Sequence, residues 1–500
     1  MNSIQMKDCR NYIGGQWVPP VGGQFRDNVN PANGKVLGRV PLSTAEDVNA
    51  AVEAAHTAYK KWRLVPAPQR GEILYRVGTL LKERKEDLAR ILTLEMGKVL
   101  EESRGEVQEA IDMSFYMAGE GRRLFGQTTP SELPNKMAMS VRESIGVVGL
   151  ITPWNFPIAI ASWKSLPALV AGNTVIWKPA TETPLMAQEF VKIYEEAGLP
   201  AGCVNLVYGS GTEVGDAMVG HPGIRVISFT GSTEVGRSIA IKGGTMLKRV
   251  SLEMGGKNAV LVMEDANLPL AVDAILWGAY GTSGQRCTAT SRVIVHRAVQ
   301  QDLEEMLTER IRQLTLGDGL AEDVKVGPII NGTSLDKIDS YVQIGKQEGA
   351  RLVIGGHRYI HPDFPAGHYY EPTLFSDVTS KMRIAEEEIF GPVISLIPVD
   401  SLEEAIAVNN QVSYGLSTGI FTQDVNRVFT AIRDIDTGIV YINAGTTGAE
   451  IHLPFGGSKG TGNGHRDSGQ AALDVFTEWK AIYVDYSGTL QRAQIDVAQS

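Results

Sequence analysis

Cys287 lies in a stretch whose composition suits a nucleophile. It belongs to the run G-T-S-G-Q-R-C-T-A-T over residues 281–290, where small neighbours leave room for a ligand. The thiolate is the reactive form of a cysteine, and the adjacent Arg286 could favour it. A free thiol is more often a small apolar residue of the core, so these residues alone leave both roles open.

Two other side chains could take part in the same chemistry. Glu253 lies in L-E-M-G-G-K-N over 252–258, between a strand-like run and a Gly-Gly turn. A general base needs such a partly desolvated position to bring its pKa toward neutrality. Asn155, in P-W-N-F-P over 153–157, could donate an amide hydrogen to a developing oxyanion. The more frequent roles, a salt-bridged carboxylate and a turn-forming asparagine, also stay open.

Two glycine-rich turns follow strand-like runs and could bind an anion. The first has Gly209, Gly211 and Gly215 in the pattern G-x-G-x-x-x-G, one residue longer than the dinucleotide fingerprint. The second, G-S-T-E-V-G-R-S over 231–238, is similar to a phosphate-binding loop, but Arg237 replaces its lysine, which argues against NTP hydrolysis. Both turns would offer the free N–H groups of a helix start to an anion. Plain strand-to-helix turns are the alternative.

The elements that must position these residues follow from the hydrophobic pattern. Helices are expected near 44–62, where Ser43 and Glu46 have capping-box spacing, and near 67–96 and 98–120. Further strands are expected at 145–152, 174–178, 204–207, 226–230, 259–263, 291–296, 351–354, 393–398, 418–421 and 438–443, with helices near 183–197, 212–220, 233–242, 298–313, 335–348 and 402–409. This alternation predicts two α/β lobes with parallel sheets and a boundary near 255–270. A last strand near 478–486 has no obvious partner, which suggests exchange of edges between subunits.

The composition narrows the class of protein. The chain has 500 residues, 43% of them hydrophobic, and 47 Lys and Arg against 57 Asp and Glu, a net charge of −10 that argues against nucleic-acid binding. The three cysteines, Cys9, Cys203 and Cys287, are too few and too widely spaced for a disulfide framework. None of the eight histidines has metal-binding spacing, so no metal is expected. The absence of a signal segment and of a long apolar run predicts a cytoplasmic protein without a membrane partner.

Six motifs occur in one order and cover nearly the whole chain. They are P-W-N-F-P at 153–157, W-K-P-A at 177–180, F-T-G-S at 229–232, L-E-M-G-G-K at 252–257, G-Q-R-C-T at 284–288 and E-E-I-F-G-P at 387–392. Together they resemble the aldehyde dehydrogenase superfamily. The resemblance implies an α/β fold with a variant Rossmann NAD(P)-binding domain, a catalytic α/β domain and a β oligomerisation arm exchanged within a homo-oligomer, a dimer or a tetramer. The implied bounds are 1–126 and 146–255 for the NAD(P)-binding domain, 256–455 for the catalytic domain, and 127–145 with 478–493 for the arm.

The resemblance also implies the catalytic roles. Cys287 matches the nucleophile, which attacks a small-molecule aldehyde to give a thiohemiacetal and, after hydride transfer, a thioester. Glu253 matches the base that activates water for deacylation. Asn155 and the backbone N–H of Cys287 match the oxyanion hole.

The cofactor implied by the resemblance is NAD or NADP. Lys178 matches the contact with the adenine ribose and Ser232 the contact with the pyrophosphate, while Glu388 and Phe390 match residues that hold the nicotinamide ribose. The residues expected at the cofactor are Ile151, Thr152, Pro153, Trp154, Lys178, Thr181, Gly211, Phe229, Gly231, Ser232, Val235, Met254, Gly255, Glu388 and Phe390.

Thr181 departs from the family pattern. Many NAD-specific members have a glutamate three residues after the lysine of W-K-P-A, where it binds the ribose hydroxyls. A carboxylate there would repel the 2′-phosphate of NADP, whereas Thr181 would not, so we predict that NADP is tolerated. Glu182, the next residue, is an alternative contact for the ribose.

Two regions also resemble a narrower branch, the α-aminoadipic semialdehyde (antiquitin-like) dehydrogenases. They are G-E-V-Q-E at 105–109 and G-T-T-G-A-E at 445–450. In that branch, the arginine before the nucleophile and a loop matching 447–449 hold the far carboxylate of the substrate, and the residue matching Glu109 meets its amino group. Arg286 suits this role because a guanidinium pairs with a carboxylate in a bidentate manner. A carboxylate-bearing semialdehyde is therefore the expected substrate, with the contacts Glu109, Arg286, Thr447, Gly448 and Ala449.

Three other functions remain as alternatives. One is a broad-specificity aliphatic or aromatic aldehyde dehydrogenase. Another is a catalytically silent structural or binding relative, against which the presence of Cys287, Glu253 and Asn155 argues. The third is a coenzyme-A-acylating enzyme, which does not need a deacylation base, so Glu253 favours a free acid as the product.

Overall fold

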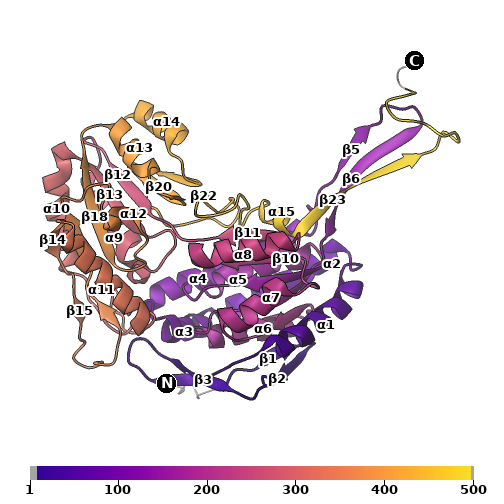
Figure 1. Cartoon of the computed structure of the whole chain (residues 1–500), viewed down its shortest axis with the longest axis horizontal. Helices are drawn as coiled ribbons and strands as arrows, with labels where there is room; N and C mark the ends of the chain where they lie inside the picture. Colours follow the sequence, from indigo (N-terminus) through magenta and orange to yellow (C-terminus); the bar gives the residue numbers. More distant parts are fainter. Residues whose placement is uncertain (1–7, 497–500) are drawn as a thin grey trace.

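The computed structural model describes residues 8–496 and has two α/β lobes with a projecting arm (Figure 1). The lobe that carries the N-terminus contains the first sheet, and the lobe formed by the middle of the chain contains the second. The arm extends away from both lobes and includes a strand from near the C-terminus. Within the described residues, no helix combines the length and the apolar character needed to cross a bilayer.

Four helices precede the parallel strands: α1 (Ala45–Trp62), α2 (Ala67–Glu83), α3 (Lys85–Met96) and α4 (Leu100–Glu120). The expected capping residue of α1 was wrong by one position. Thr44 is the N-cap, and its backbone N–H donates to Asp47 at 2.9 Å, while Ser43 is buried and accepts from Asn11. The helix expected over 67–96 is two helices, because Arg84 leaves the helical conformation between them.

The first sheet has the order β11-β10-β7-β8-β9-β1-β2, parallel from β11 to β9 and antiparallel beyond. Its strands are β1 (Asn11–Ile13), β2 (Gln16–Val18), β7 (Val147–Ile151), β8 (Thr174–Lys178), β9 (Val204–Leu206), β10 (Val226–Thr230) and β11 (Arg249–Glu253). The helices between them are α5 (Ala159–Val170), α6 (Pro184–Glu196), α7 (Asp216–Gly220) and α8 (Thr233–Thr245). Every residue of β7 and β8 is buried, as parallel strands covered on both faces require. The helix expected over 212–220 begins instead with a π-helical turn, η1 (Gly211–Gly215).

The second sheet has the order β14-β17-β18-β13-β12-β20-β21, parallel except for β14. Its strands are β12 (Asn258–Val262), β13 (Thr290–His296), β14 (Arg351–Ile354), β17 (Thr373–Ser376), β18 (Val393–Val399), β20 (Ser417–Phe421) and β21 (Ile439–Ile442). The helices of this part of the chain are α9 (Leu268–Tyr280), η2 (Gly281–Gly284), α10 (Arg297–Ile311), α11 (Gly332–Gln347), α12 (Arg383–Glu386), α13 (Leu402–Asn410) and α14 (Val425–Asp434). Together with the first sheet, this arrangement confirms the expected α/β fold class.

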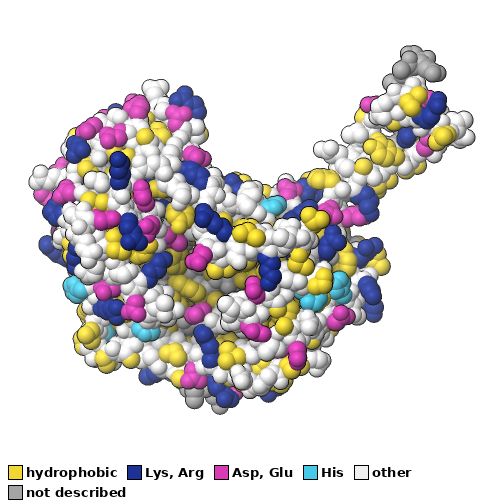
Figure 2. Space-filling model, viewed as in Figure 1, with side chains coloured by type: hydrophobic (Ala, Val, Ile, Leu, Met, Phe, Trp, Pro, Cys, Tyr) yellow, Lys and Arg dark blue, Asp and Glu magenta, His cyan; other side chains and the backbone are white. Residues whose placement is uncertain are grey.

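The arm is a three-stranded antiparallel sheet in the order β23-β6-β5. It is formed by β5 (Gln127–Pro130), β6 (Lys136–Ser144) and β23 (Thr477–Asp485), which follows α15 (Ala472–Phe476). The expected lone terminal strand therefore has a partner in its own chain, because β23 pairs with β6 along its full length. Figure 2 shows hydrophobic side chains on the projecting arm, where Trp479 and Tyr483 are exposed. Three two-stranded sheets complete the fold: β3 (Phe25–Val29) with β4 (Val36–Pro41), β15 (Arg358–Tyr359) with β16 (Tyr369–Tyr370), and β19 (Tyr414–Gly415) with β22 (Ser458–Lys459).

Candidate active site

The carboxyl ends of neighbouring strands bring several predicted residues to one edge of the first sheet. Ile151, at the end of β7, lies opposite Lys178 at the end of β8, and Thr230 of β10 lies opposite Glu253 of β11. Ligands of open α/β sheets bind outside this edge, where the loops that follow the strands meet. Residues separated by about 100 positions in the sequence thus come to face one site.

Cys287 is held by a tight loop between η2 and β13. Within η2, Thr282 and Ser283 have φ angles of 51° and 55°, which place both in the left-handed region, where non-glycine residues are uncommon. Asn258, the first residue of β12, then donates from Nδ2 to the carbonyl of Cys287 at 2.7 Å and to that of Ala289 at 2.9 Å. The nucleophile candidate is therefore fixed to the second sheet while its side chain faces the first.

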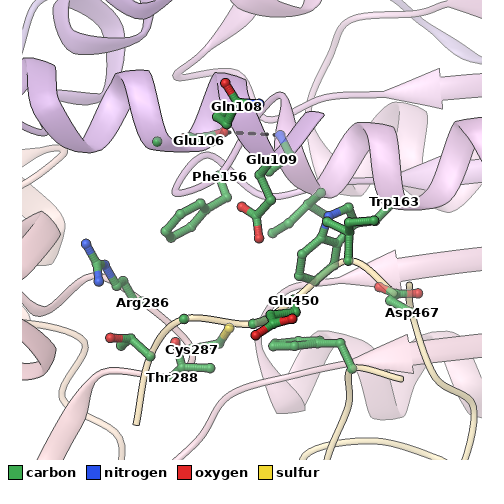
Figure 3. Close-up of a pocket in the computed structure, with 18 of the residues that line it drawn as sticks. Glu106, Gln108, Glu109, Phe156, Trp163, Arg286, Cys287, Thr288, Glu450 and Asp467 are labelled. Carbon is green, nitrogen blue, oxygen red and sulfur yellow. Dashed lines mark hydrogen bonds between the residues drawn. The ribbon is translucent and has the colours of Figure 1, made fainter. Parts of the chain in front are cut away.

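A cavity of about 770 Å³ lies beside Cys287. Figure 3 shows the sulfur of Cys287 on one wall, with Phe156 and Trp163 on the other. The walls come from α4, the start of α5, the cysteine loop and the loop around residue 449. The predicted residues that line the cavity are Glu109, Glu253, Met254, Arg286, Cys287, Thr447, Gly448 and Ala449.

Glu253 and Cys287 are both in an environment that favours their uncharged forms. Burial, followed by the negative charge of Asp467, raises the pKa of Glu253 well above its usual range. Both carboxyl oxygens of Glu253 are buried, and no described residue hydrogen bonds to them. Burial, followed by the charges of Glu253 and Glu388, raises the pKa of the Cys287 thiol to about 12. The thiol therefore needs a base to remove its proton, and Glu253 is a nearby carboxyl without a competing partner.

The expectation that Arg286 favours the Cys287 thiolate was wrong. Its guanidinium donates from Nη2 to Glu102 at 2.8 Å and from Nε to Thr282 at 3.0 Å, and it stacks on Trp277 at 4.9 Å from the ring centre. Arg286 remains in the cavity wall, but Figure 3 shows it directed away from the sulfur. Its charge is thus paired with Glu102 at the cavity wall and is not directed at the thiol.

Asn155 is buried just before α5 and is held by a charged pair that the sequence did not reveal. Its Nδ2 donates to the carbonyl of Gln285 at 3.0 Å, which links it to the cysteine loop. The backbone carbonyl of Asn155 accepts from Nζ of Lys98 at 2.7 Å. The same Nζ also donates to Glu106 at 2.7 Å. Glu106 in turn accepts from the N–H of Ile158 at 3.0 Å. This network fixes the position of the Asn155 side chain relative to Cys287.

The predicted contacts for the adenine end of the cofactor lie along the carboxyl edge of the first sheet. Lys178 is buried and donates to the carbonyls of Pro179 at 2.9 Å and Gly209 at 3.2 Å, and burial lowers its pKa to about 8. Ser232 caps α8 by accepting from the N–H of Val235 at 3.4 Å. The first N–H groups of α8 and the half-exposed apolar side chain of Val235 provide an anion site beside an apolar surface.

Space for a ligand continues along this edge. An added Cβ on Gly211 would meet no atom within 4 Å, so the turn before α7 is open. Thr181 donates to Glu182 at 3.2 Å, and Glu182 lies 3.7 Å from Arg26. The remaining residues predicted here, Ile151, Thr152, Pro153, Phe229, Gly231 and Met254, all lie at or just after the strand ends.

From the second lobe, Glu388 and Phe390 reach toward the carboxyl edge of the first sheet. Glu388 accepts from the N–H of Gly256 at 2.9 Å, and Gly255 approaches its carboxyl so closely that a Cβ there would lie 2.4 Å from an oxygen. Phe390 has a φ of 62°, a strained value for an aromatic residue, and its ring meets the edge of Trp154 at 5.5 Å. These groups, together with the open anion site of the first lobe, fit a dinucleotide.

Sequence reasoning missed the charged groups that surround the cavity. Glu102 and Glu106 are four positions apart on one face of α4, a spacing that indicates a shared side of the helix but not that this side is buried.

The other two cysteines, Cys9 and Cys203, are buried free thiols. Over residues 8–496, no group of three or more His, Cys, Asp or Glu side chains is arranged to hold a metal ion.

Comparison with known proteins agrees with this geometry. A model of the aldehyde dehydrogenase family matches residues 17–482. The chain belongs to this family. It is 46% identical over 475 residues to the α-ketoglutaric semialdehyde dehydrogenase of Bacillus subtilis, a match that covers 95% of this chain and 97% of the relative. It is 42% identical over 479 residues to the α-ketoglutarate semialdehyde dehydrogenase of Haloferax volcanii, covering 95% and 99%.

The family membership extends to the fold. A crystal structure of a point mutant of betaine aldehyde dehydrogenase from Staphylococcus aureus, in complex with NAD+, has a TM-score of 0.94 and 36% identity, covering 96% of this chain and 98% of that one. The aldehyde dehydrogenase superfamily inferred from the motifs is thereby confirmed. The narrower resemblance to α-aminoadipic semialdehyde dehydrogenases stays a prediction.

Proposed function

We propose that this aldehyde dehydrogenase oxidises a carboxylate-bearing semialdehyde to the free dicarboxylic acid. The observation that carries the proposal is the position of Arg286, a guanidinium in the wall of the cavity that Cys287 faces. Arginine suits a planar carboxylate because its donors match two oxygens at once. Two relatives of similar length are named for α-ketoglutaric semialdehyde, so this five-carbon 2-oxo aldehyde is the first substrate to test.

The reaction begins at Cys287. Glu253, in its carboxylate form, accepts the thiol proton and passes it to solvent, and the sulfur adds to the aldehyde carbon to give a thiohemiacetal. The oxyanion is held by the second amide hydrogen of Asn155 and by the backbone N–H of Cys287. Loss of hydride from the thiohemiacetal carbon leaves a thioester on Cys287.

Glu253 then serves the second half-reaction. Its carboxylate takes a proton from water, the resulting hydroxide attacks the thioester carbon, and the Cys287 sulfur leaves as the carboxylic acid is released. Burial in an apolar site raises the pKa of Glu253 toward the range in which a carboxyl both accepts and returns a proton. The presence of this base favours hydrolysis over transfer to coenzyme A.

A nicotinamide cofactor, when bound, accepts the hydride. We propose that Lys178 and Thr181 contact the adenine ribose, that Ser232 and the start of α8 contact the pyrophosphate, and that Glu388 holds the nicotinamide ribose. Thr181 places no charge beside the 2′ position, so both NAD and NADP are accepted. The nearby Glu182 and Arg26 carry opposite charges, and neither sign dominates at this end of the site.

A matrix of kcat/KM values tests the function directly. Aliphatic, aromatic, acidic and amino-acidic aldehydes are each assayed with NAD and with NADP, and Cys287→Ala provides the blank. We expect the acidic semialdehydes to have the highest kcat/KM, with measurable turnover on both cofactors. Equal kcat/KM values for acidic and neutral aldehydes of the same length would contradict the substrate class. Mass spectrometry of the product, made with and without coenzyme A, separates the free acid from a thioester.

We also propose that the arm mediates homo-oligomer formation. Its two outer strands, β5 and β23, each leave one edge without a partner among residues 8–496, and its exposed aromatic residues Trp479 and Tyr483 are typical of buried interfaces. Light scattering on a variant with Trp479→Lys and Tyr483→Lys tests this. A mass identical to that of the unmodified protein would contradict the proposal.

A further inference from the structure

The cavity presents an apparent contradiction for an anionic substrate, because its lining is rich in acidic residues. Three of these residues are neutralised by buried partners. Lys98 lies 2.7 Å from Glu106, Lys164 lies 2.7 Å from Asp467, and Arg286 lies 2.8 Å from Glu102, as the closest pairs of atoms. Glu109 also lines the cavity and has no such partner.

Glu109 lies on α4 one turn beyond Glu106, and its carboxyl points into the cavity. Figure 3 shows it directed between Phe156 and Trp163. No described residue forms an ion pair or hydrogen bond with the Glu109 carboxyl. The charges of Lys98 and Arg286 act on it, but Lys98 is paired with Glu106 and Arg286 with Glu102. A carboxyl beside aromatic rings and without a cation is more stable in its protonated form.

Other polar groups that line the same cavity also lack partners, among them Trp163, Thr230, Thr447 and both oxygens of Glu253. The indole Nε1 of Trp163 and the hydroxyl of Thr447 are both buried, and neither hydrogen bonds to any residue of the described chain. Trp163 is 5% exposed, so its N–H has no access to bulk water. Buried donors without partners are costly, which indicates that a ligand atom satisfies them. Both groups are donors, and a protonated Glu109 would be a third.

We propose that Glu109 acts as a neutral carboxylic acid that donates its hydrogen to the oxygens at the far end of the substrate, so that an anionic aldehyde binds only while Glu109 is protonated. The inference rests on the proposed function, since it concerns how a carboxylate-bearing aldehyde is held. Arg286 supplies the Nη1 donors of its guanidinium, since only Nε and Nη2 are bonded to Thr282 and Glu102, and Glu109, Trp163 and Thr447 supply neutral donors. The ionised form of Glu109 would repel the same substrate.

The charged surroundings of Glu109 set the direction of this effect. Burial raises its pKa to about 8, with the negative charge of Glu106 acting in the same direction and Lys98 and Arg286 acting against it. The titratable groups that face it are Glu106 and Asp112 of its own helix, Lys98 of the preceding loop, Arg286 and Cys287 of the cysteine loop, Tyr441 of β21 and Glu450 of the loop that follows β21. Glu109 is thus protonated below about pH 8 and carries a charge above it.

The experiment compares binding of an anion and of a neutral molecule across pH 6.5 to 9.5. The KM of α-ketoglutaric semialdehyde is measured beside that of pentanal, and 2-oxopentanoate and 2-pentanone serve as unreactive inhibitors of the same length. For the unmodified enzyme, we expect the KM and the inhibition constant of the anions to rise about tenfold between pH 7 and pH 9, while the values for the neutral compounds stay constant.

Variants assign the effect to Glu109. Glu109→Gln keeps a neutral donor at every pH, so the tenfold rise should disappear and affinity for the anions should persist at pH 9. Glu109→Leu removes the donor, so the anions should bind weakly at every pH. Asp87→Asn removes an exposed acid of the neighbouring helix α3 that does not line the cavity, and it should retain the rise. A flat pH profile in the unmodified enzyme, or an unchanged rise in Glu109→Gln, would overturn the inference.

The outcome also separates this inference from the proposed function. If acidic aldehydes are preferred but the profile does not depend on Glu109, only the inference fails. If acidic aldehydes show no preference at pH 7, both fail. An ionised Glu109 would instead favour an ammonium group, so a higher kcat/KM for an amino-acidic semialdehyde than for α-ketoglutaric semialdehyde at pH 7 would also overturn the inference.

Discussion

Lys98 provides the sharpest test of how the site is positioned. Its side chain is fully buried, and Nζ lies 2.7 Å from a carboxylate oxygen of Glu106, 2.7 Å from the carbonyl of Asn155 and 3.7 Å from the ring centre of Phe156. Lys98→Met would keep most of the volume and remove all three interactions. Since the chain contains no other described donor to the carbonyl of Asn155, the loop that carries the oxyanion donor would lose its anchor.

The size of the expected effect of Lys98→Met on stability follows from the burial of the Lys98–Glu106 ion pair. Removing one member of a buried ion pair leaves the other uncompensated and costs about 3–5 kcal/mol of stability. Displacement of a positioned donor by about 1 Å lowers the catalysed rate by roughly 10²-fold. We therefore expect a clear fall in Tm and an acylation rate, measured as the single-turnover burst of reduced cofactor, that is lower by about two orders of magnitude at saturating aldehyde.

Two further variants separate the fold from the catalysis. Lys98→Met combined with Glu106→Gln removes both charges and keeps an acceptor for the N–H of Ile158, so Tm should largely recover while the slow acylation persists. Lys85→Met removes a lysine that contacts α4 through Gln108 near the surface, and it should change neither quantity. An acylation rate equal to that of the unmodified enzyme in Lys98→Met would refute the positioning role. If the Lys98→Met and Glu106→Gln double variant had a Tm no higher than that of Lys98→Met alone, the uncompensated charge of Glu106 would not be the cause of the lost stability.

Three other predictions concern single roles in the site. Glu253→Gln should slow the burst of reduced cofactor, because the thiol loses its base, and should lower steady-state turnover by about 10²–10⁴-fold; an unchanged burst and turnover would count against Glu253 as the base. Thr181→Glu should raise the KM for NADP at least about tenfold and leave that for NAD nearly unchanged, because the new carboxylate would face the 2′-phosphate. Arg286→Lys keeps a positive charge opposite Glu102 but loses the planar fork, so the KM for acidic semialdehydes should rise more than that for pentanal; equal increases would remove Arg286 as the anchor.

The parallel strands were the part of the fold that the sequence predicted best. The strands over 174–178 and 226–230 have the expected bounds, because a strand covered on both faces is a continuous apolar run that ends abruptly. Helix α9 was not anticipated, since its sequence is apolar on nearly every side and shows little of the alternation that identifies an amphipathic helix. The cap of α1 could not be decided either, because Ser43 and Thr44 are adjacent and both can cap.

The partner of the terminal strand was outside the reach of local patterns. β23 and β6 are separated by more than 300 residues, and each is only partly buried, so neither shows a strong apolar signal. Pairing of this kind is set by the chain's path through both lobes, and not by the strand's own sequence. The same holds for the Lys98 and Glu106 pair, where each residue alone is typical of a solvated helix surface.

Arg286 lies in the cavity wall, but not for the reason that its position in the sequence suggested. Adjacency to Cys287 in the sequence suggested that its charge acts on the thiol. The two residues instead lie in a turn, closed by the Ala289 N–H donating to the carbonyl of Arg286 at 3.1 Å, and Figure 3 shows their side chains diverging from it. Arg286 therefore meets Glu102, 184 residues away, while the sulfur of Cys287 faces the first sheet. This separation is what a bifunctional substrate requires, because the aldehyde must reach the sulfur while its far carboxylate stays with the guanidinium. An arginine that contacted the thiol would stabilise the thiolate, yet it would leave no distance for the chain of a semialdehyde to span.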